Sequence, residues 1–481
     1  MQYIPSSGEM SHLLNSLQKS KVGYQTALTP SADPNAAISP LVPQQLQNTL
    51  SVATSSMSDL KLWPMLSKTP ARNTVVEYNR VIRHGGDISP FIAEGGTAAL
   101  NRSQYEKVAV QIRYLAEKRE VTDQAAEMMI VGPTPNVIAE ETRRGTERLL
   151  RRVERELFHG DSSLNDLAWD GIIKQIKDNG NSGDNRGAAL TATNCAEMLG
   201  HIYSAPFYGM VAHILVTPRV LTELIKQTVV SGRHDQLQVS GSSITYGAQN
   251  ISITGPYGPV PVVACPFLER NDRIAPAAAS SQVFEGTIET PTISAQPNAV
   301  VDATAKFTAN EAGGAVGYRY RVVPVGDAGV GVPVDTNAEI VAVGEHITFT
   351  IAQADAKATV KYYKVYRSAK DATSADGALL IGEFENDGAN TIIVDRNFNV
   401  PGSSDALFVN MAPDYMEYFQ LLSLIRRPLA QINTSYPFLL MMFGAPAVKL
   451  PSKMFVLKNC GVNAASGLSS ISDPVMLGMH V

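Results

Sequence analysis

The sequence predicts an α+β protein in which a mixed α/β domain is interrupted by a separate all-β unit. One long, highly charged helix is predicted for residues 136–158, and mixed helix and strand patterns fill residues 191–285 and 406–462. Between these two stretches, residues 286–405 contain a series of short alternating strands separated by turn residues, the pattern typical of a β-sandwich.

The composition indicates a folded chain with several domains. Its 481 residues correspond to roughly two to four domains, and 44% of them are hydrophobic. The sequence contains no run of about 18 apolar residues, so no membrane helix is predicted. Its first residues do not resemble a secretory signal peptide. The three cysteines stand far apart, which argues against a disulfide framework or a zinc site.

The N-terminal part predicts two extended segments. Residues 1–71 are rich in Ser, Pro, Gln and Asn at their start, which favours an extended arm that becomes ordered only against a neighbour; a floppy tail is the alternative. Residues 72–122 predict two strands around a long glycine-containing tip, that is, an extended hairpin. Such a two-stranded ribbon is not stable by itself and needs another surface.

The helix over 136–158 combines a partial apolar stripe with a dense set of charges. From Glu140 to Phe158 there are five Glu, six Arg and no Lys. A solvated helix face is the simplest interpretation, but the planar guanidinium group suits ion pairs at interfaces better than a lysine does. We therefore take the six arginines as candidate inter-subunit contacts: Arg143, Arg144, Arg148, Arg151, Arg152 and Arg155.

The predicted all-β unit also differs from the rest of the chain in charge. Residues 286–405 hold 15 Asp and Glu against 9 Lys and Arg, a net charge of −6, whereas all other residues together carry +1. The strands predicted on both sides of this stretch read as parts of one domain, so the acidic unit is predicted to be inserted rather than appended. If the chain assembles with copies of itself, we expect the acidic unit to face the outside of that assembly and to be dispensable for forming it.

No residue pattern predicts catalysis, and we expect no enzyme activity, cofactor or metal ion. The chain has no phosphate-binding glycine loop, no nucleophile elbow and no helical His pair for a metal. His159-Gly160-Asp161 is interpreted as a helix end followed by a turn, and Gly183–Gly187 as a simple loop rather than an anion site. The tyrosines at 362, 363 and 366 favour core packing over sugar binding.

The order of these parts resembles the major capsid proteins of tailed bacteriophages with the Hong Kong 97-type fold. Segments that carry the resemblance are LAEKREVTDQAAEM at 115–128, AHILVTPRVLTEL in the middle of the chain, and the strand-rich ending from RRPLAQ to NCGV. The resemblance implies an N-terminal arm (1–71), an extended loop (72–122), a peripheral domain with the spine helix (123–190), and an axial and peripheral core (191–285 and 406–462). Residues 286–405 resemble an immunoglobulin-like or fibronectin type III insertion, and residues 463–481 form a tail without a match.

The resemblance also implies a function and partners. It implies self-assembly through hexamers and pentamers into an icosahedral shell that encloses phage DNA without sequence specificity, in the virion and without a membrane. Scaffolding, portal and decoration proteins are further implied partners, and the host bacterial cytoplasm is the implied site of assembly. An encapsulin-like nanocompartment shell is the alternative, and a surface adhesin or carbohydrate-binding protein is a more distant one.

Overall fold

The computed structural model describes residues 57–461, except 90, 128–135, 231–237, 241–242, 246–250, 279–281, 284–286, 354–358 and 432. The predicted tail and most of the predicted arm therefore lie outside the described residues. Residues 53–123 and 141–481 form one compact unit, while residues 124–140 belong to another; each is described by itself.

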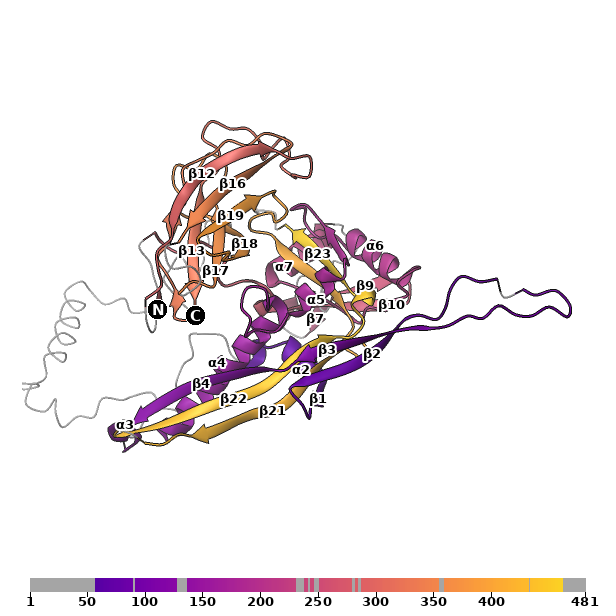
Figure 1. Cartoon of the computed structure of the whole chain (residues 1–481), viewed down its shortest axis with the longest axis horizontal. Coiled ribbons are helices and arrows are strands. Elements are labelled where there is room, and N and C mark those ends of the chain that lie inside the picture. Colours follow the sequence, from indigo (N-terminus) through magenta and orange to yellow (C-terminus); the bar gives the residue numbers. More distant parts are fainter. Residues whose placement is uncertain are drawn as a thin grey trace, which may run out of the picture. The chain divides into compact units, whose positions relative to one another are not determined.

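A long two-stranded hairpin follows the first described residues in the chain (Figure 1). Strand β2 (Val75–Arg83) pairs antiparallel with β3 (Gln104–Gln111), with Val76 opposite Val110 and Tyr78 opposite Val108. The period-two alternation of the sequence predicts these two strands, and this prediction is confirmed. The hairpin contacts the neighbouring sheet through Tyr78, whose hydroxyl donates a hydrogen bond to the carbonyl of Val448.

The predicted return strand is in fact two strands. The prediction that residues 72–122 form a single hairpin is therefore wrong for the second half of the return strand. The strand pattern breaks at Ile112, which is buried, and whose amide donates to the carbonyl of Thr74. After this residue, β4 (Arg113–Thr122) leaves β2 and pairs with β22 instead. The alternation of Val108, Val110, Ile112 and Tyr114 hides the change of partner, because it runs past the end of β3. In the structure the more buried positions shift from the even-numbered residues of β3 to the odd-numbered residues of β4.

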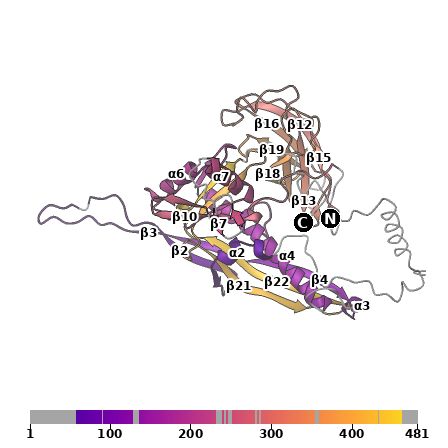
Figure 2. The same ribbon diagram turned by 180° about the vertical axis from the view of Figure 1, so that it is seen from behind.

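A four-stranded sheet supports the longest helix. Its order is β1-β21-β22-β4, and β22 pairs antiparallel with both of its neighbours. Helix α4 (Val137–His159) lies beside this sheet (Figure 2), and its Gly145 faces Leu440 of β22. Leu149, Val153 and Leu157 of the helix are buried. The helix prediction for 136–158 is thus confirmed within one residue at each end. The other strands are β1 (Lys68–Pro70), β21 (Met416–Pro428) and β22 (Ser435–Val448).

A six-stranded mixed sheet and three helices form a second layer. The strand order is β5-β23-β20-β6-β10-β9, with β5 parallel to β23 and β6 parallel to β10. Cys195 and Leu199 of α6, Val220 of α7 and Phe408 of β20 share one buried core. The elements are α5 (Ile172–Asp178), β5 (Ser182–Asp184), α6 (Ala192–Tyr203), β6 (His213–Val216), α7 (Pro218–Val230), β9 (Ser252–Gly255), β10 (Gly258–Ala264), β20 (Ser404–Val409) and β23 (Phe455–Cys460).

Residues 282–395 contribute only strands, in two sheets. One sheet has the order β12-β16-β19, and the other β11-β14-β13-β17-β18, with β15 beside β13. Tyr320 of β13, Phe349 of β16 and Ile393 of β19 belong to one core shared by both sheets. The strands are β11 (Gln282–Val283), β12 (Thr292–Val301), β13 (Tyr320–Gly326), β14 (Gly329–Val330), β15 (Val334–Asp335), β16 (Glu345–Ala352), β17 (Tyr362–Arg367), β18 (Leu379–Glu385) and β19 (Asn390–Asp395).

Short elements connect these layers. The sequence predicts neither the 3-10 turns nor the smallest strand pair. The short elements are η1 (Met57–Asp59), α2 (Leu62–Met65), α3 (Asp123–Glu127), β7 (Gln238–Ser240), β8 (Ser243–Thr245), η2 (Pro266–Leu268) and η3 (Pro451–Lys453).

Two helix-interior glycines give a matched test of the packing between α4 and its sheet. A Cβ atom at Gly145 would lie 2.5 Å from Cδ1 of the buried Leu440, whereas nothing lies within 4 Å of a Cβ at Gly200 of α6. Glycine in a helix interior costs about 1 kcal/mol relative to alanine. We therefore expect Gly200→Ala to raise the free energy of unfolding by about 0.5–1 kcal/mol.

Gly145→Ala should instead lower the free energy of unfolding by about 1–3 kcal/mol, because Leu440 must move in a packed core. Urea unfolding of both variants measures the difference. A Gly145→Ala variant that gains as much stability as Gly200→Ala would show that α4 does not lie this close to β22.

Candidate subunit-contact surfaces

The six arginines of α4 divide into an exposed group and a covered group. The side chains of Arg143, Arg148 and Arg152 are 43%, 67% and 63% exposed. Those of Arg144 and Arg151 are 23% and 15% exposed, and Arg155 is also largely covered. Arg148 and Arg152 lie four residues apart, so both occur on one face of the helix. Only the exposed group has guanidinium groups available to another molecule without a rearrangement of this chain.

The covered arginines are used within the chain. Glu147 Oε2 lies 3.2 Å from Nη1 of Arg144 and 3.8 Å from Nη2 of Arg151. Burial lowers the pKa of Arg155, and the neighbouring Arg152 lowers it further. Charge reversal at Arg144 or Arg151 would therefore disturb the fold of the subunit as well as any contact with a neighbour.

The exposed arginines also hold ion pairs within the chain. Arg148 Nη1 lies 3.5 Å from Oε1 of Glu117 on β4, and Arg152 Nε lies 2.9 Å from Oε1 of Glu156. Pairs between such exposed side chains contribute only about 0–1 kcal/mol each. Arg148 and Arg152 can therefore exchange these partners for groups on another molecule at low cost.

The hairpin tip is the second exposed surface. Phe91 is 88% exposed and Leu100 is 73% exposed, and Ile88 and Ile92 beside them are also largely open. Gly86 and Asn101 hold the base of the tip together, because the Gly86 amide donates to Oδ1 of Asn101 and Nδ2 of Asn101 returns a bond to the Gly86 carbonyl. Several exposed apolar side chains on one projection are unfavourable in water and mark an interaction site.

A buried carboxylate fixes the first described residues to α4. Glu154 is 1% exposed, and its Oε1 accepts hydrogen bonds from the amides of Lys61, at 2.9 Å, and Leu62, at 2.6 Å. Its Oε2 accepts a third bond, from the Trp63 amide at 2.7 Å. Burial raises the pKa of Glu154, while the three amides and Lys68 oppose the shift. The start of α2 is thus held at one point on α4.

The residues with a possible chemical role have structural roles instead. His159 Nε2 bonds the Leu268 carbonyl at 3.0 Å, and Asp161 accepts from Ser163 and pairs with Lys174 at 3.1 Å. This is the predicted helix end followed by a turn. Tyr363 and Tyr366 are 0% and 2% exposed, so the prediction of core packing is confirmed for both.

A cavity of about 410 Å³ next to His159 is lined by charges that already have partners. Lys177 pairs with Asp405 at 2.7 Å, and Arg219 pairs with Glu269 at 3.1 Å. Among the described residues, no group of three or more His, Cys, Asp or Glu side chains is arranged to hold a metal ion. No helix among the described residues is long and apolar enough to cross a membrane. The cavity thus offers no evident reactive arrangement.

Comparison with known proteins identifies relatives of one kind. No protein-family model matches the chain. Its sequence is 24% identical over 433 residues to the major capsid proteins of Staphylococcus phages S25-3 and K, an alignment that covers 86% of this chain and 89% of each relative. A related protein of Enterococcus phage phiEF24C is 22% identical over 465 residues, covering 93% of this chain and 96% of the relative. The predicted function, a structural protein of a capsid shell, is confirmed by these relatives.

Solved structures give a weaker likeness to shell proteins. The capsid of Myoviridae phage XM1 has a TM-score of 0.41 at 9% identity and covers 86% of this chain and 96% of its own. The SrpI encapsulin of Synechococcus elongatus has a TM-score of 0.42 at 11% identity and covers 90% of this chain and 98% of its own. Scores this low carry no conclusion about the chain, so the sequence relatives alone decide its function.

His159 gives the shell protein a predictable acid sensitivity. Burial lowers its pKa from 6.5 to about 4, so the folded subunit keeps the imidazole neutral. The unfolded chain takes up a proton below pH 6.5, and stability is therefore lost as the pH falls from about 6.5 towards 4. We expect His159→Gln, which keeps a donor but does not titrate, to lose less stability over this range than the wild type, by up to ~3 kcal/mol.

The measurement is the free energy of unfolding by urea at pH 7 and pH 4.5. His84→Gln, at an exposed histidine beside the hairpin tip, is the control and should follow the wild type. Parallel pH profiles for His159→Gln and the wild type would show that His159 is already protonated or solvated in the folded subunit.

Proposed function

We propose that this shell protein assembles with copies of itself, through hexamers and pentamers, into an icosahedral shell that encloses phage DNA. The observation that carries the proposal is the alignment with phage major capsid proteins over most of both chains. The proposal includes a Hong Kong 97-type fold, in which residues 1–71 are the arm, β2 and β3 the extended loop, and α4 the spine helix. Assembly would take place in the host cytoplasm, with scaffolding, portal and decoration proteins as further partners.

The all-β residues are proposed to be an immunoglobulin-like insertion on the outer side of the shell. Strand β20 pairs with β6 and β23, so Ser404 and Asp405 are part of the core sheet, and the insertion between core strands ends before them. At its start, the bridge between Ile274 and Leu379 already ties residues ahead of 286 to the strands of the insertion. The net charge of −6 supports an outward position, since acidic residues repel packaged DNA.

The hairpin tip is proposed to bind a neighbouring subunit. Phe91 and Leu100 would lose their contact with water there, at about 25 cal/mol per Å² of buried apolar area. Phe91→Ser with Leu100→Ser should therefore reduce the yield of closed shells strongly, without loss of subunit folding. Negative-stain microscopy of purified protein counts the shells, and circular dichroism checks the fold.

Leu167→Ser is the matched control for the tip variant, because Leu167 has the same 73% exposure as Leu100 but lies in the turn between α4 and α5. A wild-type chain that remains a monodisperse monomer under all assembly conditions would overturn the shell function. Normal shell yield from the tip variant would overturn the role of the hairpin. DNA, rather than a cargo protein, in particles from producing cells would decide between the capsid and the encapsulin-like alternative.

The exposed arginines of α4 are proposed as contacts between subunits, with Arg148 and Arg152 foremost. Arg148→Glu with Arg152→Glu should lower the free energy of unfolding of the subunit by no more than about 1 kcal/mol, because both ion pairs are exposed. Shell formation should fall by about tenfold or more if these charges meet acids on a neighbour.

Lys361→Glu is the control for this reversal, because Lys361 is 42% exposed and pairs only loosely with Asp327, at 3.6 Å. Light scattering during assembly measures the rate and yield. Equal yields for the α4 variant and the control would remove Arg148 and Arg152 from the proposed interface.

A further inference from the structure

The loop after β5 has a backbone shape that aims one arginine away from its own sheet. Arg186 and Gly187 have φ values of 51° and 78°, the left-handed region that few non-glycine residues adopt. Two bonds hold the loop to the core strand β23: the Asn185 amide donates to the Lys458 carbonyl, and the Gly187 amide to the Asn459 carbonyl. The Arg186 amide also donates to Oδ1 of Asp184 at 3.0 Å. The loop is therefore a fixed base for the Arg186 side chain.

The Arg186 guanidinium group is bound by the inserted residues. Its Nη1 donates to the Asn397 carbonyl at 2.7 Å, and its Nη2 donates to the Lys306 carbonyl at 2.5 Å. The exchange is reciprocal, because Nζ of Lys306 lies 3.0 Å from Oδ2 of Asp184. A cation of the core thus contacts the insertion, and a cation of the insertion contacts the core. The Arg186 guanidinium group is thus bound to two carbonyls and is not offered to an anion by the loop at Gly183–Gly187.

Two buried asparagines complete the connection where the chain returns from the insertion. Asn397 and Asn459 both have a φ of 57°, and they are 0% and 3% exposed. Nδ2 of Asn459 donates to Oδ1 of Asp184 at 2.7 Å and to the Phe398 carbonyl at 2.8 Å, while its Oδ1 accepts from the Val400 amide at 2.9 Å. Asparagine tolerates the left-handed conformation better than other side chains do, which is a reason for its use at both positions.

The connection continues into the core of the insertion. Oδ1 of Asn397 accepts from Nη2 of Arg367 at 2.8 Å, and Nη1 of Arg367 pairs with the buried Asp395 at 2.7 Å. Burial alone would lower the pKa of Arg367, but Asp395 raises it, so the Arg367 guanidinium group stays charged. A displacement of Asn397 would leave buried charges without their partners, which is costly.

A second polar contact joins the insertion to the core at another point. Arg270, which follows η2, donates from Nη1 to Oε2 of Glu383 on β18 at 3.1 Å. Lys364 of β17 pairs with Asp272. Burial would raise the pKa of Asp272, but Arg270 and Lys364 lower it well below its usual value. Two separate attachment points prevent rotation, whereas one flexible linker would allow it.

We propose that Asp184, Arg186, Lys306, Asn397 and Asn459 form a latch that holds the inserted unit in one orientation on the subunit, with Arg186 as its positioning residue. The insertion is then an integral part of each subunit and not a knob on a flexible stalk. The sequence alone favours an accessory that can be removed without cost. The latch argues against that expectation, because removal of the insertion would take the carbonyls of Asn397 and Lys306 from Arg186 and would take Glu383 from Arg270.

Hydrogen exchange of the full-length chain tests the latch through the Arg186→Met variant. The Val400 amide reports directly, because it donates to Asn459. We expect exchange at residues 398–403 to become about tenfold faster or more, since each lost bond involves a charged group. The amides of Val322 on β13 and Val365 on β17 should keep their wild-type rates, because the insertion stays folded.

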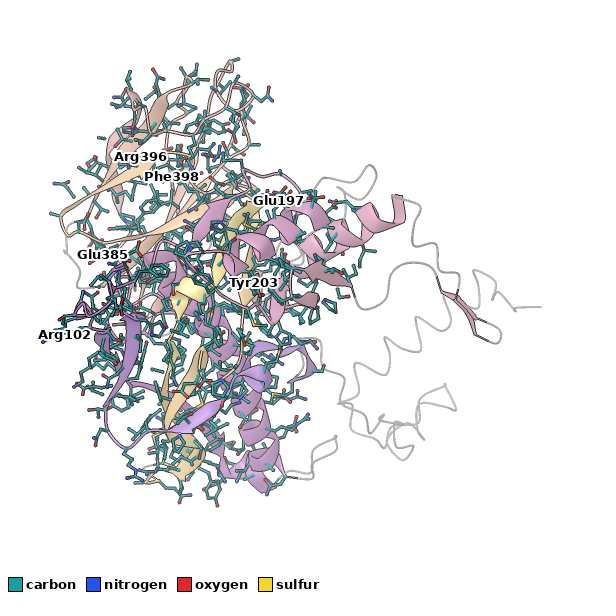
Figure 3. The ribbon with its side chains drawn as sticks, turned by 90° about the vertical axis from the view of Figure 1, so that its right-hand side faces the viewer. Arg102, Glu197, Tyr203, Glu385, Arg396 and Phe398 are labelled. Atoms are coloured by element: carbon teal, nitrogen blue, oxygen red, sulfur yellow. The ribbon has the colours of Figure 1, made fainter. Side chains whose placement is uncertain are left out.

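The control is Arg396→Met, since Arg396 pairs with Asp302 at 2.7 Å inside the insertion and contacts no core residue in the described contacts; Figure 3 labels it beside Phe398. It should leave exchange at 398–403 unchanged. Unchanged exchange in Arg186→Met overturns the latch, and so does faster exchange throughout β13 and β17, which would make Arg186 a residue of the insertion's fold. If Arg186→Met yields no folded protein, Lys306→Met, which removes only the reciprocal ion pair, is judged by the same two outcomes.

Discussion

The packing of α4 against the sheet of β4, β22 and β21 is the constraint on which the other parts of the subunit depend. The helix passes so close to β22 that only glycine fits at position 145, above Leu440. The same helix carries Glu154, which receives the amides at the start of α2, and its last turn carries His159, which holds the Leu268 carbonyl. One element thus fixes the start of α2 and the position of η2, which holds Leu268. A shift of α4 would disturb both at once, because buried polar groups must keep their partners.

Much of this arrangement follows from the sequence, where local pattern decides the structure. The charged helix, the hairpin strands and five strands of the insertion all show their period clearly. The sequence does not predict strand β12, since Pro297 and two alanines, Ala295 and Ala299, interrupt its alternation. Two irregularities in its pairing with β16 fall in the same part of the strand. The division of residues 104–122 into β3 and β4 does not follow from the sequence, because the apolar alternation up to Tyr114 runs past the residue at which the buried face changes.

The side-chain roles were harder to predict because they depend on residues far away in the chain. Nothing local distinguishes Arg144, which meets Glu147, from Arg148, which stays exposed and meets Glu117 of another element. Asn397 and Asn459 are two ordinary asparagines in the sequence, and their shared left-handed backbone becomes visible only in the fold. Burial and pairing therefore had to come from the structure, whereas the long helix and the regularly alternating strands follow from the sequence.

The charges of the insertion connect its two properties, a strong acidic excess and a fixed attachment. Arg321 and Arg367 are 2% and 3% exposed and are neutralised inside the insertion, by Asp335 and by Asp395. Lys306 and Lys364 face Asp184 and Asp272 of the core. These cations are turned inward or towards the core, so they screen the outer surface of the insertion little.

In the proposed shell, identical acidic units on neighbouring subunits would repel one another at separations up to about a Debye length, roughly 8 Å at physiological salt. A unit on a flexible stalk would respond to this repulsion by swinging to variable positions. Two polar attachments to the core resist that motion, and they place their own cations where an adjacent unit cannot compete for them. The same charges that make the surface acidic towards solvent therefore also make a firm attachment to the core necessary.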